Sequence, residues 1–191
     1  MPETSELLAY YRWLCERTNA YIGQRVLVAG PACWEIAFQL GSRRMIVGVD
    51  REQQPIEIFN KRFIDTKHFH ARQCDLSNSE SLTLSQFNLD TVFCVNALER
   101  TASDSMALQH IHDLLSQEGY AIFLVPALPR LSKWLDPTGA VRHRYSKSQI
   151  LQKLDQHRFH VVDHFYFNSM GLFFPSHRTY LDRRSMIDRL Q

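Results

Sequence analysis

The order of its secondary-structure signals constrains the fold of this chain more than any other feature. Five short apolar runs have the length and composition of buried strands: residues 25–30, 45–49, 67–71, 90–96 and 120–125. Between them, apolar residues recur at helical spacing in three segments: residues 34–40, 53–63 and 107–115. Strands that alternate with helices build a mostly parallel sheet with helices on both faces. We therefore predict a Rossmann-like α/β domain.

The remaining segments complete this domain. Residues 1–20 contain an amphipathic helix, and the S-x-x-Q spacing from Ser146 to Gln149 predicts a helix that starts with a capping box. Gly119 is predicted to close the preceding helix. We expect a sixth strand at residues 159–167 and a helical tail at residues 176–191. The length of 191 residues suits one domain, residues 1–191.

Composition narrows the possible functions. A net charge of +2 is too small to suggest bulk nucleic-acid binding. No apolar run approaches the ~18 residues of a membrane span, and the first residues lack the basic start of a signal peptide. The four cysteines and nine histidines are dispersed, so we predict reduced thiols, no metal site and a cytoplasmic protein. Glycine is scarce, with seven residues against about thirteen expected from average usage.

Polar residues that follow the predicted strands mark a candidate site. In open α/β sheets, ligands bind outside the carboxyl ends of the strands, near the point where the strand order reverses. Asp50 stands twenty positions after Gly30, at the tip of the second strand, where nucleotide-binding folds keep the acid that accepts hydrogen bonds from ribose hydroxyls. A helix N-cap is the alternative interpretation of Asp50.

An ordered set of short motifs resembles the class I S-adenosylmethionine-dependent methyltransferases. It is most similar to small bacterial enzymes with N-LE, VPA and HYRRYS-like motifs. The segments that carry the resemblance are RVLVAGPACWEIAFQL from Arg25, VGVD from Val47, CDL from Cys74, DTVFCVNALER from Asp90, LVPALPRL from Leu124 and RHRYSKSQI from Arg142.

The resemblance implies a cofactor, S-adenosylmethionine, and residues that bind it. Gly30 would face the methionine part, Asp50 would bind the ribose hydroxyls, Asp75 and Leu76 would border the adenine, and Asn96 would close the methionine end. The complete implied set comprises residues after the strands and in the first helix: Gly30, Ala32, Asp50, Asp75, Leu76, Asn96, Tyr11 and Arg12.

The glycine loop departs from the family pattern. Val28 replaces the acid that helps to hold the cofactor's ammonium group, and Ala32 and Trp34 replace two glycines that let the backbone approach the ligand. The indole of Trp34 either packs outward or fills part of the pocket. The last, seventh strand of the family's sheet is either missing or reduced to a stub at residues 170–175.

Methyl transfer mainly requires alignment, with a base only where the acceptor carries a proton. The candidate bases are His143, Glu99 and Tyr145. Arg142 and Arg144 belong to a basic segment that would favour an anionic acceptor, either a small molecule or one linked to a carrier; a solvated basic loop is the alternative.

Three functional hypotheses follow. The first is an active methyltransferase, and the second is a degenerate methyltransferase that serves as a binding or scaffolding subunit beside a homologous partner. The third, a nicotinamide-dependent oxidoreductase, is disfavoured because Gly30 stands alone where G-x-G-x-x-G would be required.

Overall fold

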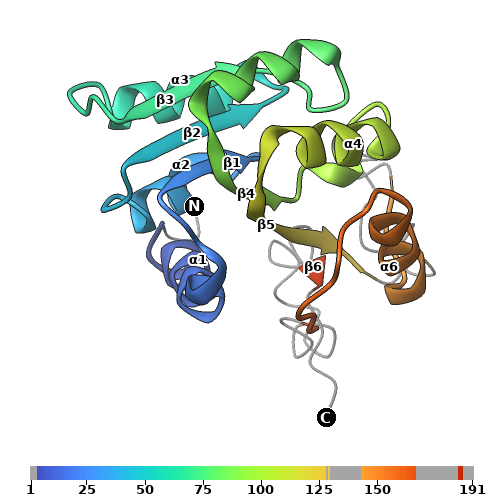
Figure 1. Ribbon diagram of the computed structural model, residues 1–191. Coiled ribbons are helices and arrows are strands. Elements are labelled where there is room, and N and C mark those ends of the chain that lie inside the picture. The colour runs from blue at the N-terminus through green and yellow to red at the C-terminus, as the bar shows by residue number, and fades with distance from the viewer. Residues whose placement is uncertain (1–3, 128, 130–142, 167–184, 187–191) are drawn as a thin grey trace.

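The protein is built around a six-stranded sheet with the strand order β3-β2-β1-β4-β5-β6 (Figure 1). The computed structural model describes residues 4–127, 129, 143–166 and 185–186. The first five strands are parallel, and β6 is antiparallel to β5. The strands are β1 (Arg25–Ala29), β2 (Met45–Asp50), β3 (Phe69–Gln73), β4 (Leu89–Val95), β5 (Leu115–Pro126) and β6 (Ser185–Met186).

Helices cover both faces of this sheet. The α-helices are α1 (Thr4–Thr18), α2 (Cys33–Gln39), α3 (Gln53–Arg62), α4 (Asp104–Leu114) and α6 (Lys147–Gln156). The described part of the chain also contains three 3₁₀ segments: η1 (Asn19–Tyr21), η2 (Ser79–Phe87) and η3 (Leu98–Arg100). Figure 1 shows α1 and α2 on one side of the sheet and α4 and α6 on the other.

The burial of strand β1 on both faces explains why its sequence is a continuous apolar run. Val26 and Val28 face a core cluster shared with α1, α2 and α3, whereas Leu27 and Ala29 face a second cluster shared with α4 and α6. Both faces of the strand are buried, so its sequence is continuously apolar rather than alternating. The predicted Rossmann-like α/β fold is confirmed, as is the capping box at Ser146 and Gln149.

Gly119 does not end a helix. Helix α4 ends at Leu114, and Gly119 lies inside β5, where a Cβ would come within 2.9 Å of the Asp90 carbonyl oxygen. The pairing of β4 with β5 is irregular between Leu89 and Thr91, and this irregularity accommodates the residues that precede Tyr120. Helix α4 ends at Leu114 and strand β5 begins at Leu115. Because both residues are apolar, periodicity alone could not place the boundary between the helix and the strand.

The segment that follows α6 is held by side chains rather than by strand pairing. Residues 159–166 are described and form no strand, contrary to our expectation. Phe159 packs edge-on against Phe123, and Asp163 pairs with Arg17 of α1 at 3.0 Å. Phe165 packs against Trp13. These contacts fix the segment across α1 without a backbone ladder.

The antiparallel edge of the sheet is short. In β6, Ser185 pairs with Pro126 and Met186 with Val125. Residues 170–175, expected as a stub of the last strand, lie outside the described residues. Of the tail predicted to be helical, residues 176–191, only these two residues are described, and they form a strand. Within the described part of the chain, none of the helices has the length and apolar character needed to span a bilayer.

Candidate cofactor site

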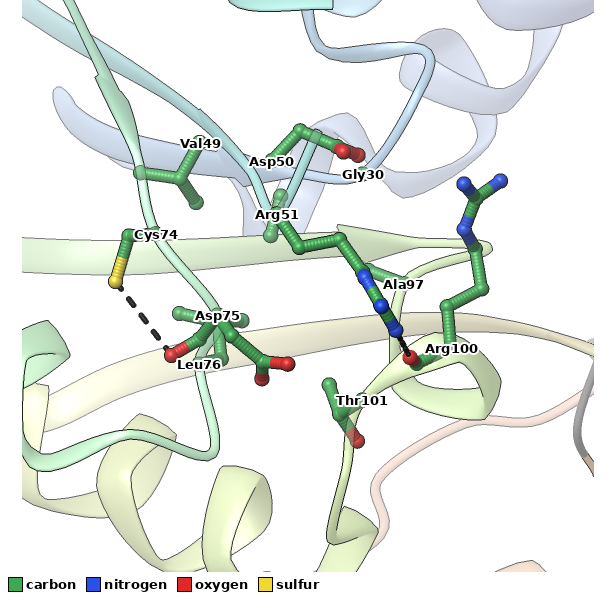
Figure 2. A pocket seen from close by; sticks show the side chains of 11 residues that line it. Gly30, Val49, Asp50, Arg51, Cys74, Asp75, Leu76, Ala97, Arg100 and Thr101 are labelled. Carbon is green, nitrogen blue, oxygen red and sulfur yellow. Dashed lines mark hydrogen bonds between the residues drawn. The ribbon is translucent and has the colours of Figure 1, made fainter. Parts of the chain in front are cut away.

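A pocket lies at the carboxyl end of the sheet, where the strand order reverses between β1 and β4. This is the position at which open α/β sheets bind ligands. Four segments meet there, namely the ends of β1 and β2 and the residues that follow β3 and β4 (Figure 2). The lining residues are Ala29, Gly30, Val49, Asp50, Arg51, Cys74, Asp75, Leu76, Ala97, Arg100 and Thr101.

Gly30 is required by its backbone conformation. Its φ is +120°, and a Cβ at this position would lie 2.0 Å from the carbonyl oxygen of Val95 in β4. Its N–H donates to the Val49 carbonyl oxygen at 2.9 Å, and its own carbonyl accepts from the Cys33 N–H at 3.0 Å. Gly30 therefore lets β1 turn into α2 while passing close to β4, which only glycine permits.

Asp50 presents a buried carboxylate at the end of β2. Its Oδ1 accepts a hydrogen bond from the Glu52 N–H at 2.7 Å. Burial raises the pKa of this carboxyl above its ordinary value, although the Glu52 N–H and Arg100 act in the opposite direction. The N-cap position of α3 belongs to Glu52, so the N-cap interpretation of Asp50 is wrong. A buried acceptor at this point suits a ligand that supplies hydroxyl donors.

Asp75 and Leu76 form the opposite wall. The Asp75 Oδ1 accepts from the N–H and the hydroxyl of Ser77, at 2.8 and 2.7 Å, which closes a tight turn. The carbonyl oxygen of Leu76 lies 2.8 Å from Nδ1 of the buried His110 in α4. His110 therefore ties this wall to the helix behind it, a role that its dispersed position in the sequence did not indicate.

Two arginines that the sequence analysis missed cross the mouth of the pocket. Nη1 of Arg51 donates to the carbonyl oxygen of Arg100, and Nη2 of Arg100 pairs with Glu52 Oε1 at 2.5 Å. In Figure 2 the Arg51 side chain runs from the end of β2 to η3, with Asp50 above it and Asp75 below it. The cavity that remains has a volume of about 20 Å³, enough for about one water molecule. The signal that could have found Arg51 is its position directly after Asp50.

The side chains at the end of β1 and at the start of α2 pack into the core. Val28 is fully buried, and Trp34 is only 9% exposed, in the cluster shared by α1, α2 and α3. The Arg62 guanidinium lies over the indole of Trp34, 3.8 Å from the ring centroid. Ala32 is buried at the start of α2. Of the two placements expected for the indole, the structure has the one away from the pocket, packed against the sheet, since Trp34 does not line the pocket.

Three further residues that the resemblance implied also lie outside the pocket lining. Asn96 is buried in a left-handed conformation with φ +49°, and its N–H donates to the Leu124 carbonyl oxygen at 2.9 Å. Tyr11 is buried in the same cluster as Trp34, and Arg12 is exposed.

The three candidate bases differ in burial and in hydrogen bonding. Glu99 in η3 is 1% exposed, and its burial raises the pKa of its carboxyl to about 8, although Arg144 lowers it. The Tyr145 hydroxyl donates to Asp104 Oδ2 at 3.0 Å, and burial together with Asp104 raises the pKa of the phenol. His143 is exposed.

Two arginines, Arg142 and Arg144, were expected to bind substrate. Arg144 is buried and donates to the Ala127 carbonyl oxygen at 3.2 Å. Arg142 lies outside the described residues.

The cysteines are buried free thiols. Burial raises the pKa of Cys15 to about 12 and that of Cys74 to about 11, and it also raises the pKa values of Cys33 and Cys94. In the described part of the chain, no three His, Cys, Asp or Glu side chains are grouped as they would be around a metal ion.

The sheet order and the pocket at its reversal point define a Rossmann-like α/β domain. Residues 30–123 match the model of a family described as a methyltransferase domain. This range runs from Gly30 to the middle of β5 and includes every pocket residue except Ala29. No curated protein matches the sequence.

Solved structures share this fold at low identity. An S-adenosylmethionine-dependent methyltransferase from Mesorhizobium loti is 17% identical with a TM-score of 0.61, and the match covers 93% of this chain and 95% of that one. The N-methyltransferase NodS from Bradyrhizobium japonicum, in complex with S-adenosyl-L-homocysteine, is 13% identical (TM-score 0.59; 81% and 74% covered). The [4+2]-cyclase SpnF is 16% identical (TM-score 0.64; 82% and 58% covered). The chain is therefore methyltransferase-like in fold.

Proposed function

We propose that this chain binds the adenosine part of S-adenosylmethionine in the pocket at the β1–β4 reversal and acts as a methyltransferase. The observation that carries the proposal is the arrangement of Gly30, Asp50, Asp75 and Leu76 around one pocket. Asp50 would accept hydrogen bonds from the ribose hydroxyls, and Asp75 and Leu76 would border the adenine. Gly30 lets the chain pass close to β4 at the edge of the pocket, because no side chain fits between them.

The adenosine half of the cofactor fits the residues present better than the methionine half. A buried carboxylate beside a glycine suits a ribose, since a diol supplies two donors to an acceptor of this kind. At the methionine end, Val28 offers no charge to an ammonium group, and its side chain is enclosed in the apolar cluster. Binding of the methionine part would therefore depend on backbone groups and on the part of the site that holds the methyl acceptor.

When bound, the cofactor supplies an electrophilic methyl group. The residues of this chain would orient acceptor and cofactor and would hold or accept protons. Glu99, with a pKa of about 8, is mostly protonated at neutral pH and would donate a hydrogen bond rather than act as a base. The phenol of Tyr145 is engaged with Asp104. His143 is the remaining candidate base, because its imidazole is exposed and a neutral ring nitrogen accepts a proton.

The acceptor is proposed to be anionic, and either a small molecule or one attached to a carrier. Support comes from Arg144, whose guanidinium lies beside Glu99 and the end of β5, and from His143 next to it. Arg142 would add a second cation to this region.

A degenerate subunit is the second candidate function. The observation in its favour is the glycine loop, in which Val28 and Trp34 are built into the core and not into a ligand cradle. In this version the chain would support a homologous methyltransferase subunit in the cytoplasm and would not bind the cofactor. The fold alone does not decide between the two, because function resides in the site and not in the fold.

Calorimetric titration with S-adenosylhomocysteine and S-adenosylmethionine tests the first proposal. We expect binding to the wild type and a loss of about 10- to 100-fold in affinity for Asp50→Asn, which removes a charged acceptor. Asp65→Asn, an exposed aspartate outside this pocket, is the matched control and should bind as the wild type does. No heat with the wild type at millimolar ligand would refute the proposal and favour the degenerate subunit, which should then copurify with a methyltransferase partner.

A further inference from the structure

We propose that the Arg51 side chain closes the adenosine pocket of the ligand-free protein, and that an adenosine ligand enters only after this side chain has moved out. We call the hydrogen bond from Arg51 Nη1 to the Arg100 carbonyl oxygen the Arg51 latch. The proposal rests on the proposed function, because it concerns access to the same pocket. It makes Arg51 a residue that sets the affinity for the nucleoside rather than one that contacts reacting atoms.

Both ends of the Arg51 latch are anchored. On the β2 side, the carbonyl oxygen of Arg51 accepts a hydrogen bond from Gln73 Nε2 at 3.0 Å. On the η3 side, the Arg100 N–H donates to the Ala97 carbonyl oxygen at 3.0 Å, and the Arg100 side chain pairs with Glu52. The latch therefore joins two anchored points of the pocket rim. Figure 2 shows the hydrogen bond between Arg51 and Arg100.

The closed pocket is too small for a nucleoside. The remaining cavity of about 20 Å³ holds about one water molecule, so no preformed space for a nucleoside lies between the two carboxylates. Arg51 contributes its side chain to the lining of this cavity, with Asp50 and Asp75 on either side of it. A ligand that reached both carboxylates would have to occupy the space that the Arg51 side chain now takes.

The latch is weak enough for a ligand to displace. Arg51 is exposed, so its guanidinium exchanges one hydrogen bond to a carbonyl for hydrogen bonds to water when it moves out. A single hydrogen bond of this kind shifts such an equilibrium by about 3- to 10-fold. The observed affinity of an adenosine ligand falls by the same factor, because only the open fraction of the protein binds it.

An alternative role for Arg51 makes the opposite prediction. If the guanidinium folded onto the ligand and held it, removing the side chain would weaken binding. The two roles are therefore separated by the sign of one measured change.

The first test is a titration of the full chain with adenosine and with S-adenosylhomocysteine. We expect Arg51→Ala to bind both ligands about 3- to 10-fold more tightly than the wild type. Arg44→Ala removes an exposed arginine just before β2, away from the pocket, and should leave both affinities unchanged. Equal or weaker binding by Arg51→Ala, with a circular dichroism spectrum like that of the wild type, would overturn the latch.

The second test needs no ligand. Nuclear magnetic resonance of arginine side chains measures rotation about the Nε–Cζ bond, and we expect slower rotation for Arg51 than for Arg44 in the free protein. Rotation of Arg51 as fast as that of Arg44 would overturn the latch, even where the wild type binds adenosine. Slow rotation without binding by either the wild type or Arg51→Ala would support the closed pocket and overturn the proposed cofactor instead.

Discussion

Replacement of Trp34 by alanine tests whether its indole belongs to the core or to the pocket. The indole is enclosed by residues of α1, α2 and α3, and the Arg62 guanidinium covers its face at 3.8 Å. It is absent from the pocket lining. The structure therefore predicts a large loss of stability together with an unchanged affinity for adenosine.

The size of the loss follows from the burial of Trp34. A tryptophan side chain buries roughly 150–250 Å², and Trp→Ala changes in cores cost about 3–5 kcal/mol. The cation–π contact with Arg62 adds about 0.5–1 kcal/mol, because Arg62 itself is exposed. A partial collapse of neighbouring side chains into the cavity would reduce the total, so we expect Trp34→Ala to lower the free energy of unfolding by about 3–5 kcal/mol.

Urea unfolding measured by circular dichroism, at a fixed pH and for the full chain, provides the comparison. The control is Trp13→Ala, since Trp13 is 41% exposed and packs edge-on against Phe165, a contact that is worth about 1 kcal/mol. Titration with adenosine on the same samples gives the second readout. A loss below about 1 kcal/mol, or an increase in adenosine affinity of more than about threefold, would refute the outward placement of the indole.

Two other changes probe the strand ends. The pKa of Glu99 is raised from 4.5 to about 8 in the folded protein, so the folded state binds one more proton than the unfolded state between these values. Stability should thus fall by about 1 kcal/mol for each pH unit between pH 5 and 8, and Glu99→Gln should flatten this slope in urea titrations. Gly30→Ala should lower the free energy of unfolding by at least about 2 kcal/mol, because φ is +120° and the Val95 carbonyl blocks a Cβ; a stability within about 0.5 kcal/mol of the wild type would contradict that conformation.

The sheet could be predicted from the sequence because its strands are buried on both faces. In β2 and β4, apolar runs reflect burial against helices on each side, and Asp50 and Asn96 at their ends mark the carboxyl edge. The twenty-residue spacing of Gly30 and Asp50 placed two of the pocket residues correctly, since one β-α-β unit separates the ends of adjacent strands. The segment 159–166 could not be predicted, because an apolar alternation does not distinguish a paired strand from a chain held by side-chain contacts.

The contact of Arg51 across the mouth of the pocket could not be predicted from the sequence for a different reason. The contact of Arg51 with Arg100 joins residues 49 positions apart, and it depends on how far a flexible side chain reaches across the sheet edge. Likewise, the direction of Trp34 is set by the start of α2 at Cys33, a boundary that the loop sequence alone did not fix. Both features follow from geometry that only the assembled elements define.

Different physical constraints act at Gly30 and at the two positions that follow it, Ala32 and Trp34. Gly30 is held by a positive φ and by the nearby Val95 carbonyl, so no substitution could be accepted there without breaking the passage between β1 and β4. At Ala32 and Trp34 no such constraint acts, because both side chains lie in the apolar core, where they contribute packing. Under the proposed function, this loop would keep the geometry for an adenosine, while its buried side chains stabilise the fold where the methionine part would lie. If the chain binds the cofactor as proposed, a titration with adenosine alone tests a different part of the site from a titration with S-adenosylmethionine.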